Sequence, residues 1–419
     1  MKVLIIGSGG REHTLAWKIS QSPKLTKLYC APGNAGTAIV AENVPIADND
    51  IAGLKDFAVK NSIDLTIVGP EIPLVMGIVD EFEAAGLKIF GPSKAAAKIE
   101  GSKIFAKNLM HKYNIPTAEA IVYEKVEDAL NFVKKVGTPI VIKVDGLAAG
   151  KGVFVAKDQK EAEEAVKRIL VDKEFGAAGN KIIVEECLKG EEVSILAITD
   201  GETILPLASA QDHKRVFDRD EGPNTGGMGA YSPAPIATSE LLNMVQEKVL
   251  KKTVAALKEA GIIYKGILYC GLMMTASGPM VLEFNCRFGD PETQVILPRM
   301  KNDLLEVILS TLDSRLSTIA LDWDPRSAVC VVLAAGGYPG NYEKGIEIKG
   351  LDNVKDGVVF HAGTKAVDVK ITTNGGRVLG VVGLGAPLKE AIRKAYDAVK
   401  QINFDKMHFR KDIGAKALK

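Results

Sequence analysis

Long apolar runs are missing from this sequence. A helix that crosses a bilayer needs about 18 consecutive apolar residues, and no run of that length occurs in the 419 residues. The apolar start, VLII, is only a few residues long and meets glycine at Gly7, which is typical of a buried β-strand and not of a secretory signal. We therefore expect no membrane-spanning helix and no membrane partner.

Cysteine is also scarce, and no charge of one sign dominates. The five cysteines (Cys30, Cys187, Cys270, Cys286 and Cys330) are far apart and form no CxxC pair, which indicates reduced thiols and argues against a zinc site. A formal net charge of +1 gives no general attraction to nucleic acid. These features predict a cytoplasmic protein that has no nucleic-acid partner.

The length predicts two to four domains, because one hydrophobic core rarely serves 419 residues. Up to about residue 100, short apolar segments alternate with helical patterns, which predicts a parallel sheet built from βαβ units. Its strands are expected at 3–7, 28–31, 65–70 and 88–93, with helices at 13–20 and 73–86. Loops 7–11, 32–36, 69–73 and 91–93 all follow strands, so we expect them along one edge, where such sheets bind ligands.

A second pattern begins near Ser102 and continues to about residue 324. A helix followed by a connector is predicted within 103–117, and further helices at 159–170 and 239–261. Strands are predicted at 139–145, 153–158, 181–188, 192–199, 203–210, 266–275 and 279–287. The polar, glycine-rich stretch 211–233 is too long for an ordinary connection, and long irregular loops are usually functional or disordered. From about residue 325 the pattern predicts β-hairpins, including one at 371–383 around the Asn374–Gly375 turn, followed by a helix at 386–402.

The segment DGLAAGKGV carries Gly146, Gly150 and Gly152 around Lys151. Glycine lets backbone N–H groups approach phosphate oxygens, and lysine adds a positive charge. The spacing is not that of a phosphate-binding loop before a helix, because a strand follows. The segment therefore predicts a flap between two antiparallel strands that closes over a nucleotide; an ordinary flexible hairpin is the alternative.

Two further segments of this region carry charge on apolar strands. Lys143 lies within PIVIKVD, where an unpaired buried lysine is costly, so a phosphate partner or a position at a sheet edge would explain it. The run from Glu185 through Leu188 to Glu192 could hold adenine against backbone groups and accept hydrogen bonds from ribose hydroxyls. On spacing alone, a solvated acidic turn fits that run better.

The most specific stretch is VLEFNCRFGDPETQ. Glu283 and Asn285 alternate on a strand, so both side chains point to one face and offer the oxygen ligands that suit Mg²⁺. Arg287 shares that face and could meet an anionic substrate. Cys286 points to the other face, where we expect it in the core without a nucleophilic role.

Together these segments resemble the ATP-grasp superfamily and, within it, the phosphoribosylamine–glycine ligase family. The resemblance spans essentially the whole chain and rests on GSGGREH, DGLAAGKGV, EECLKGEEVS, HKRVFDRDEGPNTGGMGAYSP and RFGDPETQ. It implies a mixed α/β fold in three parts. These are an N-terminal parallel α/β, Rossmann-like domain (1–101), an ATP-grasp domain (102–324, with a lid at about 120–190) and a small β-rich domain (325–419).

The resemblance also implies the reaction. Glycine's carboxylate attacks the γ-phosphate of ATP, and the resulting glycyl phosphate reacts with the amine of 5-phosphoribosylamine to give glycinamide ribonucleotide in purine biosynthesis. ATP and Mg²⁺ or Mn²⁺ are the implied cofactors, and a monomer is the implied assembly.

Residue roles follow from the same resemblance. Lys103 and Lys143 are expected at the ATP phosphates, Glu185 and Leu188 at adenine through their backbones, and Glu192 at the ribose. Phosphoribosylamine is assigned to Gly9, Gly10, Arg11, Gly289, Asp290, Pro291 and Glu292. Glycine and its activated carboxyl are assigned to Asp212, Lys214, Arg215 and Arg287.

Other classes fit the sequence less well. A nicotinamide-dependent oxidoreductase would need a third glycine where Glu12 stands and an acidic end to the second strand, which instead reads YCAPGN. A biotin carboxylase or another purine carboxylase or synthetase would share the flap and the strand that carries Glu283 and Asn285. It would not share segments 213–233 and 287–292. A nucleotide-sensing module that performs no reaction would have little use for the complete set of metal ligands and loop glycines.

Overall fold

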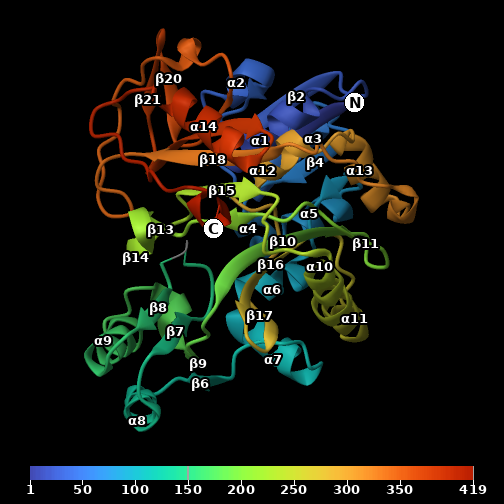
Figure 1. Ribbon diagram of the computed structural model, residues 1–419. Coiled ribbons are helices and arrows are strands. Elements are labelled where there is room, and N and C mark those ends of the chain that lie inside the picture. The colour runs from blue at the N-terminus through green and yellow to red at the C-terminus, as the bar shows by residue number, and fades with distance from the viewer. Residues whose placement is uncertain (149–150, 419) are drawn as a thin grey trace.

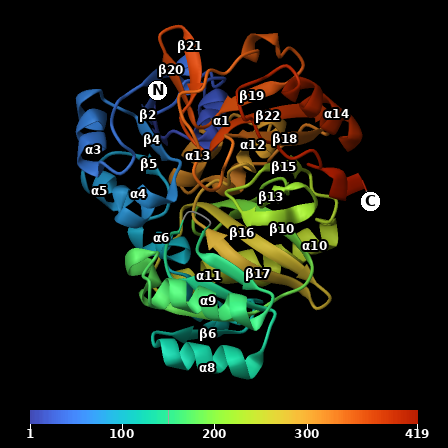
Figure 2. The same ribbon diagram turned by 90° about the vertical axis from the view of Figure 1, so that its left-hand side faces the viewer.

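The computed structural model describes residues 1–148 and 151–418, which form the layers shown in Figures 1 and 2. The N-terminal sheet is parallel, in the order β3-β2-β1-β4-β5, as the alternation of strands and helices predicted. Its strands are β1 (Lys2–Gly7), β2 (Lys27–Pro32), β3 (Glu42–Asn43), β4 (Leu65–Val68) and β5 (Ile89–Phe90).

Five helices accompany this sheet, and α6 and α7 lead out of it. The five helices are α1 (Gly10–Ile19), α2 (Thr37–Val40), α3 (Ile51–Lys60), α4 (Glu71–Met76) and α5 (Ile78–Ala84). The two that follow are α6 (Lys94–Gly101) and α7 (Lys103–Lys112). The prediction of a single helix at 73–86 was wrong, because two helices, α4 and α5, occupy this segment. It is divided by Gly77, whose φ of 101° is a left-handed conformation that ends one helix and starts the next.

A separate small layer carries the glycine-rich flap and lies at the bottom of Figure 1, far from the N-terminal sheet. Its sheet has the order β6-β9-β7-β8, with α8 and α9 packed on it around their own hydrophobic core. The elements are β6 (Ala120–Tyr123), α8 (Val126–Val136), β7 (Ile140–Val144), β8 (Val153–Ala156), α9 (Gln159–Leu170) and β9 (Ile182–Glu186). Because β7 and β8 are antiparallel neighbours, the flap joins two strands as predicted.

The central sheet is antiparallel, with the order β11-β10-β16-β17. Its strands are β10 (Glu191–Thr199), β11 (Ile204–Pro206), β16 (Gly266–Thr275) and β17 (Gly278–Asn285), and the long helix beside it comprises α10 (Ser239–Val245), a π-helical turn (Gln246–Leu250) and α11 (Lys251–Glu259). β17 ends at Asn285, so the charged segment that follows lies at the end of a buried strand.

The last sheet contains strands from two distant segments, in the order β12-β15-β18-β22-β19. They are β12 (Gln211–Asp212), β15 (Gly229–Ser232), β18 (Ser327–Ala334), β19 (Val358–His361) and β22 (Arg377–Gly385), and α12 (Thr293–Ile296) and α14 (Leu388–Val399) pack on them. α13 (Leu304–Leu312) packs against α1. Stretch 211–233 is therefore not an irregular loop. It also forms a hairpin, β13 (Arg215–Phe217) with β14 (Glu221–Asn224).

The hairpin expected around Asn374–Gly375 was also wrong. β21 (Lys370–Thr373) pairs with β20 (Thr364–Val367), and β22 pairs with β18 and β19 instead. β22 is nine residues long and mostly buried, so pairing on both edges within the sheet outweighs a local turn preference. No helix among the described residues is long and apolar enough to cross a bilayer.

Candidate active site

One cavity of about 730 Å³ lies where the flap layer, the central sheet, α6 and α7 and the β13–β14 hairpin face one another. It gathers most of the predicted site residues: Arg11, Lys103, Lys143, Gly146, Lys151, Gly152, Glu185, Leu188, Glu192, Asp212, Lys214, Arg215, Glu283, Asn285, Arg287, Asp290 and Glu292. Four others are not among the described residues that line it: Gly9, Gly10, Gly289 and Pro291. Gly150 falls outside the described residues.

Lys143 is buried in the interior of the flap sheet, on β7 between β8 and β9, so the alternative of an edge lysine was wrong. Its Nζ lies 2.9 Å from Glu185 Oε2 and donates to the Leu282 carbonyl at 3.1 Å. Glu185 is only 3% exposed, which rules out a solvated acidic turn at this position. Its Oε1 has no hydrogen-bond partner within the described residues.

Lys107, which the sequence analysis missed, completes this group. It lies on α7, 3.3 Å from Glu185 Oε2, and donates to Thr117 Oγ1 at 2.8 Å and to the Ala118 carbonyl at 3.0 Å. Burial lowers the pKa of Lys107 to about 8, although Glu185 opposes the change. One carboxylate therefore stands between two buried lysines, which leaves net positive charge at this end of the cavity.

Lys103 starts α7 and holds the base of the flap, because its Nζ donates to the Gly146 carbonyl at 2.7 Å. Burial lowers the pKa of Lys103, Glu283 raises it, and Lys143 lowers it further. Gly146 has a φ of +122°, which favours glycine, and a Cβ on Gly152 would lie 2.4 Å from a Val144 methyl. Gly146 is thus favoured by its backbone conformation and Gly152 by close packing, and both line the cavity.

A cluster of carboxylates surrounds Lys214 on the opposite wall. Lys214 Nζ lies 2.9 Å from Glu192 Oε2 and 3.9 Å from Glu283 Oε1. Burial raises the pKa of Asp212 to about 7; Lys214 opposes this, and Glu292, Glu192 and Glu283 add to it. Burial opposes ionisation of Lys214, but the surrounding carboxylates raise its pKa well above the usual value. Lys214 therefore stays protonated among the carboxylates of this wall.

Arg287 connects three elements at the end of β17. Its guanidinium contacts Glu71 Oε2 at 3.2 Å and Glu100 Oε1 at 3.0 Å, and it donates to Asn285 Oδ1 at 2.9 Å. Glu100 also accepts from the backbone N–H of Cys286 at 2.7 Å. Cys286 is buried, and burial with the nearby Glu100 raises the pKa of its thiol, so the core placement is confirmed.

Glu283 and Asn285 suit a divalent cation whose coordination shell is completed by phosphate oxygens of a nucleotide. Burial opposes ionisation of Glu283, but Lys214, Lys143 and Lys103 hold the pKa of its carboxyl below the usual range, so it is an anionic donor at neutral pH. Both residues line the cavity on the face that also presents Lys214 and Arg287. No group of three or more His, Cys, Asp or Glu that could hold a metal occurs in residues 1–148 and 151–418.

The loops of the N-terminal sheet meet the segment after β17 at the far end of the cavity. Arg11 forms an ion pair with Glu12 at 2.6 Å and donates to the Phe288 carbonyl at 3.1 Å. Glu12 also accepts from the Gly9 N–H at 2.6 Å, so a side chain already caps this helix N-terminus. The Arg11 guanidinium, and not the Gly9–Gly10 backbone, therefore faces the cavity.

Asp290 and Glu292 are each held by partners that sequence reasoning missed. Arg377 lies 3.3 Å from Asp290 Oδ1 and donates to the Asp290 and Gly226 carbonyls at 2.7 Å. Tyr269 donates to Glu292 Oε1 at 2.5 Å. Arg377 and Tyr269 also line the cavity, as do Glu71 and Glu100.

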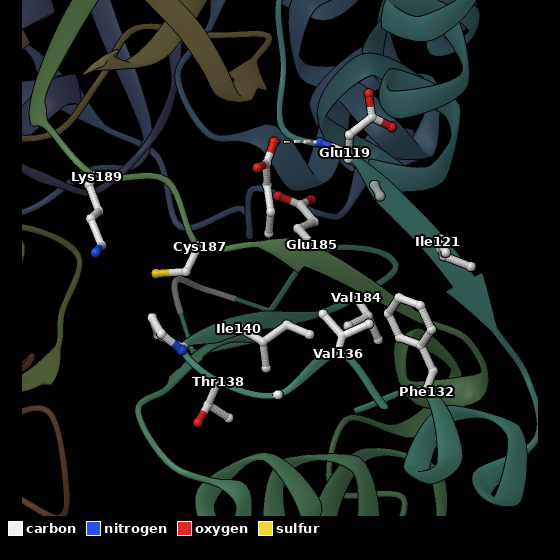
Figure 3. A pocket seen from close by; sticks show the side chains of 14 residues that line it. Glu119, Ile121, Phe132, Val136, Thr138, Ile140, Val184, Glu185, Cys187 and Lys189 are labelled. Atoms are coloured by element: carbon white, nitrogen blue, oxygen red, sulfur yellow. Dashed lines mark hydrogen bonds between the residues drawn. The ribbon is translucent and has the colours of Figure 1, made fainter. Parts of the chain in front are cut away.

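A second cavity of about 430 Å³ lies on the flap layer, between β6, β9 and α8 (Figure 3). Ile121, Phe132, Val136 and Ile140 give it apolar walls, with Lys189 at one end. It shares residues 185–187 with the main cavity, so this short segment is the wall between the two.

The sheets and the main cavity define the class of protein first: an antiparallel central sheet faced by a small flap layer across a ligand-sized cavity is the arrangement of the ATP-grasp fold. Residues 101–293 match the ATP-grasp (A) domain of phosphoribosylglycinamide synthetase, and residues 1–100 and 328–416 match its N and C domains. The chain therefore belongs to the phosphoribosylglycinamide synthetase family.

Individual relatives agree with this assignment. The chain is 54% identical to the phosphoribosylamine–glycine ligase of Caldanaerobacter subterraneus subsp. tengcongensis over 415 residues, 99% of this chain and 100% of the relative. A phosphoribosylamine–glycine ligase structure from Thermotoga maritima aligns with a TM-score of 0.85 and 35% identity over 99% of this chain and 100% of that one. A biotin carboxylase domain from Hydrogenobacter thermophilus, solved with MgADP and bicarbonate, shares the fold alone (TM-score 0.74, 14% identity, 97% and 91% covered).

Proposed function

We infer that this chain joins glycine to 5-phosphoribosylamine in an ATP-dependent reaction that gives glycinamide ribonucleotide, ADP and phosphate, a step of de novo purine biosynthesis. The observation that carries this inference is the meeting of Lys143, Glu192 and Glu283 around one cavity, although they come from three different strands. The family assignment and the names of the full-length relatives support the choice of substrates.

ATP is assigned to the part of the cavity beneath the flap. Lys103 and Lys143 face the phosphates, and Lys151 and Gly152 on the flap close over them. The backbone of Glu185 and Leu188 borders adenine, and Glu192 accepts the ribose hydroxyls. The buried Lys107–Glu185–Lys143 group supports this assignment, because its net positive charge favours a polyphosphate.

Glu283 and Asn285 are assigned to Mg²⁺ or Mn²⁺. When bound there, the metal would neutralise charge on the phosphate oxygens of the nucleotide. The chain's own contribution is to keep Glu283 ionised, through Lys214 and the neighbouring lysines, and to orient Asn285 through its hydrogen bond to Arg287.

Phosphoryl transfer to glycine requires positioning and charge neutralisation but no covalent nucleophile on the protein. Lys214 and Arg287, which line the cavity, are assigned to the glycine carboxylate, together with Asp212 and Arg215. The oxygen of that carboxylate forms a bond to the γ-phosphorus, and the bond to ADP breaks. Closure of the flap over glycyl phosphate excludes water, which would otherwise hydrolyse the mixed anhydride.

The amine of phosphoribosylamine then attacks the acyl carbon, forming the amide and releasing phosphate. Arg11, Asp290 and Glu292 are assigned to this substrate because they line the end of the cavity formed by the N-terminal loops. Gly9, Gly10, Gly289 and Pro291 are assigned to the same substrate as sequence neighbours of these residues. We also assign a monomeric state, and we assign residues 1–101, 102–324 and 325–419 as the domains.

An ADP-release assay with ATP and phosphoribosylamine tests the proposal when glycine is compared with alanine, serine and bicarbonate. We expect release that depends on both glycine and the amine, with glycinamide ribonucleotide formed in equal amount. Release that depends on bicarbonate, or that ignores glycine, contradicts the proposal.

A further inference from the structure

The C-terminal segment 408–416 is bound along almost the whole turn between β13 and β14. His408 Nε2 hydrogen-bonds with the Val216 carbonyl at 2.8 Å, and its ring packs edge-on against Phe217. The Lys411 N–H donates to Asp218 Oδ1 at 2.7 Å. Consecutive residues of the hairpin therefore contact the end of the chain, some 190 residues further on.

Arg410 is the centre of this contact and is completely buried. Its Nη1 donates to the Arg215 carbonyl at 3.2 Å and to Asp220 Oδ1 at 2.8 Å. Its Nε and Nη2 bind both oxygens of Asp412, at 2.7 and 2.8 Å. A bidentate guanidinium–carboxylate pair of this kind fixes direction as well as distance.

Asp412 in turn holds the strained part of the turn. Arg219 and Asp220 have φ values of 60° and 57°, in the left-handed region that side-chain-bearing residues seldom adopt. The Arg219 N–H donates to Asp412 Oδ2 at 2.8 Å. Burial opposes ionisation of Asp412, but its hydrogen bonds from Arg410 and from Arg219 lower its pKa to about 2, so the pair stays charged.

The segment that bears Arg410 is itself fixed to the C-terminal sheet. Tyr396 on α14 donates to the Arg410 carbonyl at 2.8 Å and accepts from the Ile413 N–H at 3.0 Å. Ala334 at the end of β18 exchanges two backbone hydrogen bonds with His408. The C-terminal segment is therefore anchored to α14 and β18, and from this position it contacts the hairpin.

The held hairpin is a wall of the active site. Arg215 lies at its start, Lys214 immediately precedes it, and both line the main cavity together with Asn224 and Thr225 at its other end. Thr225 donates twice to the Lys214 carbonyl, from its N–H and its hydroxyl, both at 2.8 Å. A shift of the turn would therefore move the backbone that carries both cations.

We propose that Arg410, which lies outside the cavity, is a positioning residue for glycine activation: through Arg215 and the 218–220 turn it sets the place of Lys214 and Arg215 in the cavity. The proposal rests on the proposed function, which assigns these two cations to glycine and its activated carboxyl. Displacement of such groups by about 1 Å can cost about 100-fold in rate.

Arg410→Met and Asp412→Asn test the proposal in the full-length protein. We expect kcat/KM for glycine to fall about 10- to 100-fold in Arg410→Met and less in Asp412→Asn. KM for ATP should rise by a smaller factor than kcat/KM for glycine falls, because Lys103 and Lys143 lie on other elements, whereas a shift of Lys214 also alters its pairs with Glu192 and Glu283. Arg410→Lys, which keeps the charge but loses the bidentate pair, should lie between wild type and Arg410→Met.

Arg393→Gln is the matched control, since Arg393 also binds two carboxylates but is exposed, and its partners Glu390 and Asp397 belong to its own helix, α14. It should behave as wild type. If the folded fraction of Arg410→Met is low, Asp412→Asn and Arg410→Lys decide the matter. Wild-type values for glycine in both overturn the proposal, as does an equal loss for glycine and ATP. Failure of the wild-type protein to use glycine contradicts the proposed function instead.

Discussion

Lys143 and Glu185 form a buried ion pair of 2.9 Å across neighbouring antiparallel strands, β7 and β9. Lys143 lies opposite Ile183 in the register, so Glu185 is its diagonal neighbour on the same face. Lys107 approaches the same carboxylate oxygen from α7 at 3.3 Å. Two lysines thus share one anion, and Lys143 also donates to the Leu282 carbonyl of β17.

The two lysines should therefore respond differently to removal. Lys143→Met should raise KM for ATP by about 10- to 100-fold, because a charge-assisted contact to phosphate is lost while Glu185 keeps Lys107 as its partner. Lys107→Met should mainly lower the free energy of unfolding, by about 3 kcal/mol, because a buried ion pair and two hydrogen bonds are lost. Steady-state kinetics and urea unfolding of both variants measure this. The reverse pattern would assign the phosphate contact to Lys107.

Glu283→Ala should abolish turnover, with a loss of at least about 1,000-fold in kcat, because the metal loses its anionic ligand. The thermal unfolding midpoint should change little, since the carboxylate faces the cavity. Binding of Mn²⁺ in the presence of ADP, followed by electron paramagnetic resonance, should weaken in parallel. Glu191→Gln, at an exposed carboxylate on β10, is the matched control and should retain activity. Near-normal turnover in Glu283→Ala would refute the metal site.

Arg11→Met should raise KM for phosphoribosylamine by about 10- to 100-fold and leave KM for ATP and glycine nearly unchanged. The reason is that Arg11 lines the cavity at the end formed by the N-terminal loops, away from the flap. Initial-rate measurements with each substrate varied in turn give the three values. A rise confined to ATP would place the sugar phosphate elsewhere.

Three buried histidines should make the fold sensitive to acid. Burial lowers the pKa of His13 to about 3 and those of His213 and His361 to about 4, from an unfolded value of 6.5. The unfolded chain then binds more protons than the folded one below pH 6.5, so stability falls as the pH decreases from 6.5 toward 4. Each histidine contributes a slope of up to about 1.4 kcal/mol per pH unit in that window.

His213→Leu isolates one of these contributions. Neither ring nitrogen of His213 has a hydrogen-bond partner in the part of the chain that the structure describes, so the substitution removes a titrating group without breaking such a bond. Urea unfolding at pH 7, 6 and 5 should give a profile flatter than that of wild type by about 1.4 kcal/mol per pH unit near pH 5. Parallel profiles for the two proteins would show that His213 is not buried in its neutral form.

Local patterns predicted the mixed α/β class, and the resemblance to the ATP-grasp superfamily predicted which residues meet around the cavity. Alternating strands and helices indicated the parallel sheet, and the period of two in VLEFN placed Glu283 and Asn285 on one face. The Lys143 pattern indicated a buried cation in a strand. Its partner could not be identified, because Glu185 belongs to a strand that follows a whole helix later.

The missed residues lie mostly on helices. Glu71, Glu100 and Lys107 read as ordinary charged positions of amphipathic segments, and only packing reveals that they face the cavity. Lys107 had one available signal, since it stands four residues after Lys103 and so shares its helix face. The strand pairing of the C-terminal sheet could not be predicted for a similar reason. β22 pairs with β18 and β19 because it is buried between them, although the Asn374–Gly375 sequence favours a local hairpin.

The central claim, that the cavity activates glycine as an acyl phosphate, is tested most directly by the fate of a carboxylate oxygen. Turnover with ATP, phosphoribosylamine and glycine labelled with ¹⁸O in both carboxyl oxygens should transfer one ¹⁸O atom into each inorganic phosphate released, as mass spectrometry of the phosphate would show. The amide product should keep the other. Phosphate that carries no label while glycinamide ribonucleotide forms would contradict the account.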